Sequence, residues 1–203
     1  GRIQVRRVHV YGSAAEIGPC DLVILATKAT ANEALRTLLP PLLGPHTAVL
    51  TLQNGLGVEE PVAEVVGAER VLGAICYIAC VRTSPGVVRC AFPGLIEIGE
   101  FGRPPQGRTR RVAALFQQSG VKARVHENLE LQRWHKLVWN VPFNGLAIAA
   151  GGVTTDVILG DDGLRAQARR LMEEVVAAAG KCGQEIPRSV IDLQFERTAR
   201  MAG

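Results

Sequence analysis

The sequence predicts an α/β fold: a partial doubly wound parallel sheet with an antiparallel edge, followed by an all-α helical domain. Short, continuous apolar runs alternate with helical stretches through the first half of the chain, and Asp21–Thr27 (DLVILAT) is the clearest of them. Runs that are apolar on both faces are typical of parallel strands covered by helices. After Glu127 only helical periodicity remains. We therefore expect two domains, residues 1–127 and residues 128–203.

The parallel part of the sheet follows from a β-α-β-α-β alternation, which implies right-handed crossovers. A sheet of this type normally begins with a strand that leads into G-x-G-x-x-G. No such motif occurs here, so we expect a partial sheet in which the first βαβ unit with its glycine loop is absent. The expected strands are Val5–Val10, Asp21–Thr27 and Ala48–Leu52, and the expected helices are Asn32–Leu39, which ends at Pro40–Pro41, and Val58–Val66.

The rhythm then changes, because three strand-like runs follow one another without helices between them. The turn signals Ser84–Pro85–Gly86 and Pro93–Gly94 separate these runs, and together they predict an antiparallel meander at one edge of the sheet. The rest of the first domain is expected as a loop, a short helix and a last strand. The three runs are Val71–Val81, Gly86–Phe92 and Leu95–Gly99, and the later segments are Arg103–Arg110, Arg111–Ser119 and Val121–Val125.

The second domain is predicted to contain three helices. Asp161–Asp162 provides an N-cap for the second helix, and Pro187 suits the first turn of the third. The predicted helices are Leu129–Ala150, Leu164–Gly180 and Arg188–Met201.

Composition argues against several classes of function. The net charge of +4 is spread over scattered arginines and aromatic residues make up only 4% of the chain, which argues against a nucleic-acid partner. Five cysteines without zinc-site spacing indicate reduced thiols in a cytoplasmic protein. We expect no metal site, no signal peptide and no membrane span. Neither a G-x-S-x-G elbow nor a Walker A loop occurs, which excludes serine hydrolases and P-loop enzymes.

The segment Trp134–Leu146 (WHKLVWNVPFNGL) carries the strongest chemical signal. On a helix, Lys136, Asn140 and Asn144 follow at i, i+4 and i+8 and share one face. Their neighbours are mostly apolar, so we expect a helix buried nearly all round, with Pro142 bending it. An amine and two amides could bind a keto acid there, and a partly buried lysine can act as a general acid. The alternative is a surface lysine and two asparagines that bond to nearby backbone.

Two further segments lie where ligands of open α/β sheets bind, at the carboxyl ends of strands. In Thr51–Gly57 (TLQNGLG), Asn54 can donate and accept hydrogen bonds, and the glycines let a ligand approach the backbone. The alternative is an Asn-Gly hairpin turn. Lys28 follows the Asp21–Thr27 strand and either holds an anionic cofactor or extends from the strand end into water.

Taken together, these features resemble one family, the ketopantoate reductases (2-dehydropantoate 2-reductases). The order and spacing of five motifs match from about residue 5 onward. The last motif, W-x-K-L-x-x-N-x-x-x-N, is the most specific of them. The matching segments are Lys28–Ala29, Gln53–Asn54–Gly55, Tyr77–Ile78–Ala79, Gly94–Gly99 and Trp134–Asn144.

The resemblance implies the NADPH-dependent reduction of a branched 2-keto acid, 2-dehydropantoate, to pantoate in pantothenate and coenzyme A biosynthesis. In this role Lys136 is the general acid that protonates the C2 oxygen. Asn140 and Asn144 bind the hydroxyl and carboxylate groups of the substrate.

For the cofactor, the resemblance implies a Rossmann-type NADP-binding domain. Asn54 lies beside the nicotinamide and its ribose, Lys28 lies near the adenosine half, and Ala79 contacts the cofactor through its backbone. It also implies a helical domain that binds substrate and allows a homodimer.

The chain departs from the family pattern in ways that keep alternatives open. The glycine-rich loop and the basic residue after it are missing, and a Ser and a Glu of the last helices would follow Gly203, so we expect a sequence truncated at both ends and inactive on its own. A substrate-binding Asn of the family falls near Thr154–Thr155. The alternatives are another β-hydroxyacid dehydrogenase, or a non-catalytic ligand-binding relative.

Overall fold

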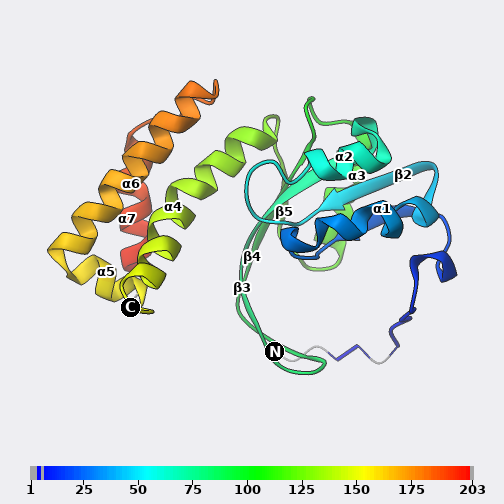
Figure 1. Cartoon of the computed structure of the whole chain (residues 1–203), viewed down its shortest axis with the longest axis horizontal. Coiled ribbons are helices and arrows are strands. Elements are labelled where there is room, and N and C mark those ends of the chain that lie inside the picture. The colour runs from blue at the N-terminus through cyan, green and yellow to red at the C-terminus, as the bar shows by residue number, and fades with distance from the viewer. Residues whose placement is uncertain (1–3, 6, 202–203) are drawn as a thin grey trace. The chain divides into compact units, whose positions relative to one another are not determined.

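The structure is a computed structural model that describes residues 4, 5 and 7–201. The chain divides into two compact units, Gly1–Glu127 and Asn128–Gly203. The first unit contains every strand of the described part of the chain, and the second is helical (Figure 1). Each unit has its own hydrophobic core.

The first unit is built on a five-stranded mixed sheet in the order β1-β2-β3-β4-β5. Strands β1, β2 and β3 are parallel to one another, β4 is antiparallel to β3, and β5 is parallel to β4. The predicted α/β class, with a parallel part and an antiparallel component, is confirmed. The strands are β1 (Cys20–Leu25), β2 (Leu43–Thr51), β3 (Val71–Ser84), β4 (Val87–Glu100) and β5 (Ala123–Val125).

Helices cover both faces of this sheet, as a doubly wound fold requires. Strand β2 shows the division, because Val49 packs into one cluster and its neighbours Ala48 and Leu50 pack into the other. The Val49 face is covered by α1 (Leu35–Leu38) and α2 (Glu60–Val66), and the other by α3 (Gly107–Gln118). The two apolar faces explain why the second half of β2 contains the apolar run Ala48–Leu50.

Several expected elements of the first unit need correction. The strand predicted at Val5–Val10 is wrong, because its described residues have no regular structure, and Val5, Val8 and Val10 are exposed. The helix predicted at Asn32–Leu39 consists of the end of the 3₁₀ segment Ala29–Ala34 and one α-helical turn, Leu35–Leu38. The remaining short segments are 3₁₀ helices: η1 (Ala14–Glu16), η2 (Ala29–Ala34), η3 (Pro40–Leu42) and η4 (Ala68–Arg70).

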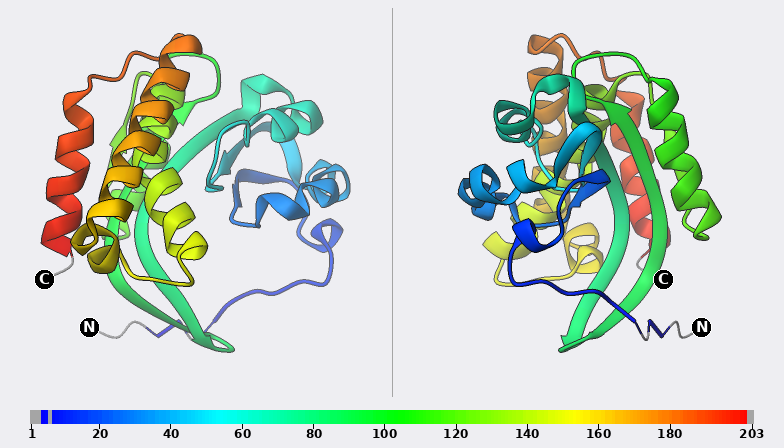
Figure 2. Two further views of the ribbon diagram at one scale, coloured as in Figure 1. Left: turned by 60° about the vertical axis from the view of Figure 1, so that its left-hand side comes forward. Right: turned by 90° about the vertical axis from the view of Figure 1, so that its right-hand side faces the viewer.

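The predicted three-stranded meander is also wrong, because β3 and β4 form one long, curved hairpin (Figure 2). Only Pro85–Gly86 is a turn. Pro93–Gly94 lies within β4, at a register shift where Tyr77 pairs with Leu95 and Ala79 with Phe92. Gly94 has φ +61°, and a Cβ there would lie 1.4 Å from the carbonyl oxygen of Tyr77. Glycine thus permits a bulge that bends the strand instead of ending it.

The second unit consists of α4 (Leu129–Ala149), α5 (Thr155–Gly160), α6 (Asp162–Lys181) and α7 (Ser189–Met201). The three long helices confirm those predicted, and α5 had not been predicted. Asp161 caps α6 as expected, since its Oδ1 accepts a hydrogen bond from the Leu164 amide at 2.8 Å. None of the helices described is long and apolar enough to cross a membrane.

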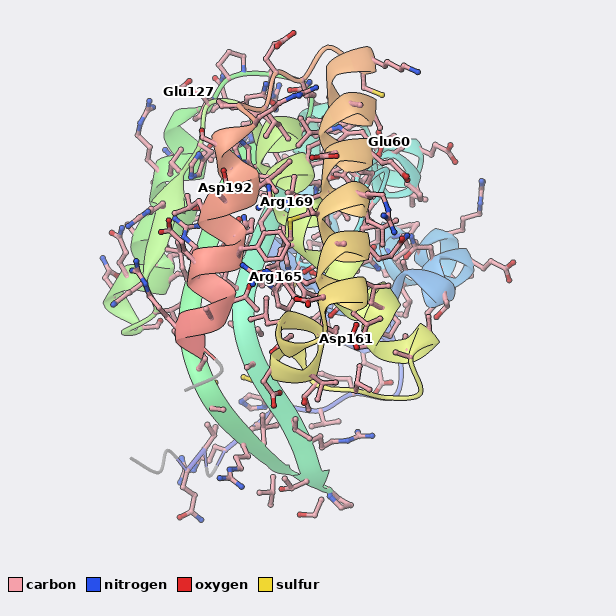
Figure 3. All side chains as sticks on the ribbon, turned by 90° about the vertical axis from the view of Figure 1, so that its left-hand side faces the viewer. Glu60, Glu127, Asp161, Arg165, Arg169 and Asp192 are labelled. Carbon is pink, nitrogen blue, oxygen red and sulfur yellow. The ribbon has the colours of Figure 1, made fainter. Side chains whose placement is uncertain are left out.

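Helices α6 and α7 are joined by polar and aromatic contacts, and Figure 3 shows Arg169 and Asp192, which form one of them. Arg169 lies 2.8 Å from Asp192, and its guanidinium also lies 5.0 Å from the ring centroid of Phe195. Phe195 continues into the core, where its ring meets Phe143 of α4 edge-on at 6.1 Å. These contacts fix α7 against the helix that carries the predicted lysine.

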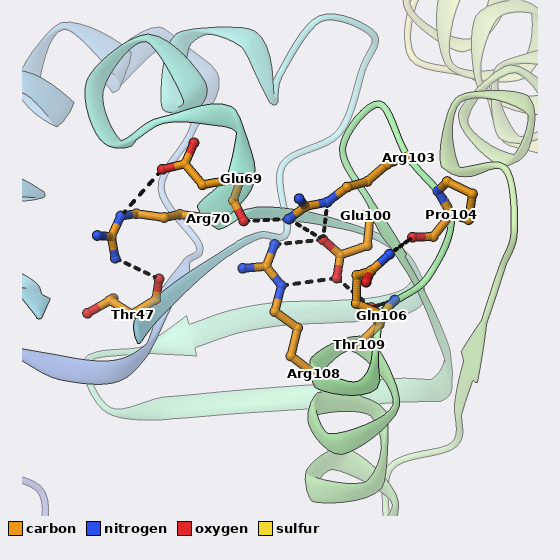
Figure 4. A network of polar contacts seen from close by, with 9 residues as sticks. All are labelled: Thr47, Glu69, Arg70, Glu100, Arg103, Pro104, Gln106, Arg108 and Thr109. Carbon is orange, nitrogen blue, oxygen red and sulfur yellow. Dashed lines mark hydrogen bonds and ion pairs between the residues drawn. The ribbon is translucent and has the colours of Figure 1, made fainter. Parts of the chain in front are cut away.

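A buried carboxylate joins the end of β4 to α3 (Figure 4). Glu100 is only 2% exposed, and it accepts hydrogen bonds from Arg103, Arg108 and Thr109. Helix α3 begins at Gly107, within the segment predicted as a loop, because Arg108 and Thr109 already belong to this network. The pKa of Glu100 is lowered: burial alone would raise it, but the hydrogen bonds from Arg108 and Thr109 and the nearby arginine charges outweigh that effect.

Candidate active site

Two of the sequence-predicted residues follow neighbouring parallel strands at the same edge of the sheet. Leu25 and Thr51, the last residues of β1 and β2, pair with each other, and the Leu52 amide donates to the Leu25 carbonyl at 2.8 Å. Lys28 and Asn54 each come three residues after these strand ends. This is the carboxyl edge, where open α/β sheets bind ligands.

Lys28 stands at the start of the 3₁₀ helix η2, and its side chain is exposed. Its backbone carbonyl accepts a hydrogen bond from the Ala31 amide at 2.9 Å, which turns the chain away from β1. An exposed lysine at this edge fits both interpretations of the sequence: it can bind an anionic cofactor, or it can simply extend into water. Its role in cofactor binding therefore stays a prediction.

Asn54 is exposed in a loop shaped by glycines. Gly55 and Gly57 have φ +112° and +68°, values that residues with a Cβ rarely adopt. The loop leads into α2 and then into β3, which pairs parallel to β2. A hairpin would make these strands antiparallel, so the Asn-Gly hairpin alternative is excluded.

Gln53, the residue before Asn54, holds the two loops at this edge together. Its side chain is almost fully buried, and Nε2 donates to Asn32 Oδ1 at 2.8 Å and to Thr27 Oγ1 at 3.3 Å. It thereby ties the loop after β2 to the segment on either side of Lys28. The sequence motif contained Gln53, but no spacing or pattern indicated that its side chain would bridge two loops.

Ala79 lies farther along β3, beyond the same edge. Strand β3 pairs with β2 only through Gly73 and then continues in the hairpin with β4. Ala79 is exposed and sits between two register shifts, opposite Phe92. The structure therefore places Lys28 and Asn54 after neighbouring strands at one edge of the sheet, whereas Ala79 lies farther along β3, in the hairpin with β4.

The other three predicted residues lie on α4. Lys136 and Asn140 are half-buried, and Asn144 is exposed. The expectation that this helix is buried nearly all round is wrong, since Val141 is 40% and Ile148 80% exposed. The apolar positions outnumber those that one face can bury, so the three polar residues run from the edge of the buried face towards the exposed one.

Helix α4 is fixed at its start and along its buried face. Asn128 caps it by accepting from the Leu131 amide, and its own amide group donates to Gln184 Oε1 at 3.0 Å. Trp139 donates from Nε1 to Thr198 Oγ1 of α7 at 2.8 Å. The helix continues through Pro142, which lies on the buried face. Lys136 and Asn140 are thus carried by a helix that is anchored at its start, by Asn128, and between the two residues, by Trp139.

Histidine, cysteine, aspartate and glutamate do not come together as metal ligands. Within the residues that the structure describes, no group of three or more of them could hold a metal ion. His126 lies 3.2 Å from Glu97 at the end of β5, a pair that joins two strands.

A doubly wound sheet with polar residues at its carboxyl edge, joined to a helical unit with a Lys-x-x-x-Asn pair, defines the class of Rossmann-type two-domain proteins. Two family models match this chain: ketopantoate reductase PanE/ApbA over residues 1–103, and the C-terminal model of the same family over residues 128–203. The chain belongs to the ketopantoate reductase family, which is a family of oxidoreductases.

Curated proteins and solved structures agree with this assignment. A 2-dehydropantoate 2-reductase from Nostoc sp. is 36% identical over 206 residues, covering 99% of this chain and 64% of that protein. The crystal structure of 2-dehydropantoate 2-reductase from Geobacter metallireducens has a TM-score of 0.90 and 41% identity, covering 94% of this chain and 64% of its own. This chain therefore spans less than two thirds of the length of these relatives.

A more distant structure shows that the fold extends beyond ketopantoate reductases. D-mandelate dehydrogenase in complex with NADH has a TM-score of 0.80 with 23% identity, over 87% of this chain and 59% of its own. At that identity the likeness concerns the fold alone.

Proposed function

We propose that the protein to which this chain belongs reduces 2-dehydropantoate to pantoate with NADPH. The observation that carries the proposal is the Lys136, Asn140 and Asn144 series on α4, in a chain matched by both family models. The curated relative from Nostoc sp. bears the name 2-dehydropantoate 2-reductase, which supports this substrate.

In the proposed reaction, Lys136 is the general acid. Bound NADPH supplies the hydride that reduces the C2 carbonyl. The ammonium of Lys136 then gives its proton to the C2 oxygen, so that no free alkoxide has to form in water. Its half-buried position on an anchored helix supports this role, because a proton donor needs both a fixed geometry and access to substrate.

Asn140 and Asn144 are proposed to orient the substrate. Each amide offers an acceptor oxygen and two donor hydrogens, which suits hydroxyl and carboxylate groups. Their increasing exposure along α4 supports this assignment, since Asn144 is accessible to a ligand that also reaches Lys136. The half-buried Asn140 would contribute more orientation than Asn144, because its rotamer is more restricted.

Lys28, Asn54 and Ala79 are proposed as cofactor contacts. An exposed cation, an exposed amide and a loop of positive-φ glycines at one sheet edge fit an anionic dinucleotide. Ala79 would contribute backbone groups, because its side chain has no polar atom. A homodimer in the cytoplasm completes the proposal, and equilibrium sedimentation would test the assembly.

The full-length protein tests this function directly. It should oxidise NADPH when ketopantoate is added, and Lys136→Ala should lower kcat by about 10²–10⁴-fold. Lys181→Ala, which removes an exposed lysine at the end of α6, is the matched control and should retain activity. Preference for a 3-hydroxy acid with NAD would favour another β-hydroxyacid dehydrogenase. Full activity of Lys136→Ala would overturn the mechanism, and ligand binding without turnover would indicate a non-catalytic relative.

A further inference from the structure

Two cysteines face each other across the β3–β4 hairpin. Cys80 of β3 pairs directly with Cys90 of β4, and their sulfur atoms are 2.7 Å apart. Directly opposed residues in antiparallel strands have Cα atoms about 4.5–5.5 Å apart. Disulfides span Cα separations of about 4.4–6.8 Å. The strands therefore already hold the two thiols at a separation that a covalent bond can bridge.

Both thiols are also accessible. Cys80 and Cys90 are exposed, whereas Cys20 and Cys76 of the same unit are half-buried. A small oxidant in solution can therefore reach both sulfurs of the pair.

We propose that Cys80 and Cys90 are a redox-modification site, at which a hydroperoxide converts the two thiols into a reversible cross-strand disulfide. The proposal does not rest on the proposed reduction of a keto acid. Its reactant belongs to a different chemical class, although Cys80 directly follows Ala79, a proposed cofactor contact.

Either thiol can attack the peroxide first, because the strand pairing places the two sulfurs opposite each other. The Cys80 S–H donates to the Cys90 sulfur, and the pKa of Cys80 is raised, chiefly by this hydrogen bond.

When Cys90 reacts first, its thiolate attacks one peroxide oxygen. The O–O bond breaks, the other oxygen leaves with a proton as water or an alcohol, and Cys90 becomes a sulfenic acid. The Cys80 sulfur then attacks the sulfur of Cys90. The S–O bond breaks, and the oxygen takes up the Cys80 proton and leaves as water. The two thiols lose two electrons, which the peroxide gains, and a dithiol reductant reverses the change.

Peptide mapping after hydrogen peroxide treatment tests the site. Trypsin cleaves after Arg82 and Arg89, which separates the two cysteines into different peptides that only a disulfide would join. We expect the purified protein to yield this joined pair without reductant, and to lose it after dithiothreitol. With increasing peroxide, Cys80 and Cys90 should lose their reactivity towards an alkylating reagent together, before the exposed Cys182 of the other unit does.

Variants distinguish this site from other outcomes. Cys80→Ser should abolish the joined peptides, whereas Cys76→Ser, in the same tryptic peptide, and Cys182→Ser should keep them. Circular dichroism of Cys80→Ser would show that the hairpin still folds. The proposal is overturned if peroxide leaves both thiols alkylatable, oxidises Cys90 to a stable sulfinic acid, or links Cys80 only to a second chain.

Discussion

The guanidinium of Arg108 donates two hydrogen bonds to the carboxylate of Glu100, from Nε to Oε1 at 3.1 Å and from Nη2 to Oε2 at 2.6 Å. Bidentate pairs of this kind are among the stronger polar contacts in proteins. The side chain of Glu100 is fully buried and that of Arg108 is 22% exposed. The pair therefore joins the end of β4 to the first turn of α3. Because the carboxylate is buried, water could not replace Arg108 if that side chain were removed.

We expect Arg108→Met to destabilise the α/β unit by about 3 kcal/mol, because it leaves a buried carboxylate with fewer donors. Arg103 and Thr109 would still donate, which keeps the loss below that of an unpaired charge. Denaturant unfolding followed by circular dichroism measures the change. Arg110→Met removes an exposed arginine of the same helix and should change stability by less than about 0.5 kcal/mol. Equal losses in both variants would refute the assigned role.

Acid should weaken this unit through the same carboxylate. The pKa of Glu100 is lowered from its ordinary 4.5 in the folded chain, so its contribution is fully present above that value and is lost as the pH falls through the folded pKa. The free energy of unfolding should therefore decline below about pH 4.5. Glu100→Gln should be less stable at neutral pH and should show a flatter decline. An unchanged acid dependence in Glu100→Gln would contradict the prediction.

How much of this could be read from the sequence depends on the range of the interactions. The Asp21–Thr27 run predicted β1 because its apolar residues form a local, unbroken signal, although only Leu25 of the strand is buried and Ile24 is exposed. The Val5–Val10 run has similar residues, yet its described part pairs with no strand. A strand needs a neighbour, and a single run of β-branched residues does not reveal whether one exists.

The candidate site divides in the same way. The i, i+4, i+8 spacing of Lys136, Asn140 and Asn144 was visible because a helix repeats locally. The link from Gln53 to Asn32 and Thr27 was not, because it joins loops that only the folded sheet brings together. Side-chain bridges between distant segments leave no periodic trace in a single sequence.

The bulge at Gly94 should be the most sensitive glycine position of the hairpin. Gly94→Ala combines a left-handed backbone with a Cβ 1.4 Å from the Tyr77 carbonyl oxygen, so the strands must move apart. We expect a loss of about 3 kcal/mol. Gly86→Ala, at the turn of the same hairpin with φ +74° and open space around it, should lose about 1 kcal/mol. The midpoint temperature of thermal unfolding measures both losses. A similar decrease of that temperature in the two variants would argue against the close approach of Gly94 to the Tyr77 carbonyl.

The two tryptophans of α4 provide a matched pair for the anchoring of the lysine helix. Trp139 donates to Thr198 at 2.8 Å, whereas the buried Nε1 of Trp134 has no hydrogen-bond partner among the described residues. Trp139→Phe should therefore lose about 1–2 kcal/mol more stability than Trp134→Phe, since the first removes a satisfied donor and the second an unsatisfied one. Thr198 still donates to the Gln194 carbonyl at 2.7 Å, which limits the loss.

Each of these variants retains one tryptophan, so fluorescence-detected unfolding reports on the helical unit in both cases. If α4 must be anchored to hold Lys136, Trp139→Phe should also lower kcat of the full-length protein more than it raises KM. Equal stability of the two variants would show that the bond to Thr198 contributes nothing to the position of α4. A kcat that falls only with Trp134→Phe would instead assign the anchoring role to the first turns of the helix.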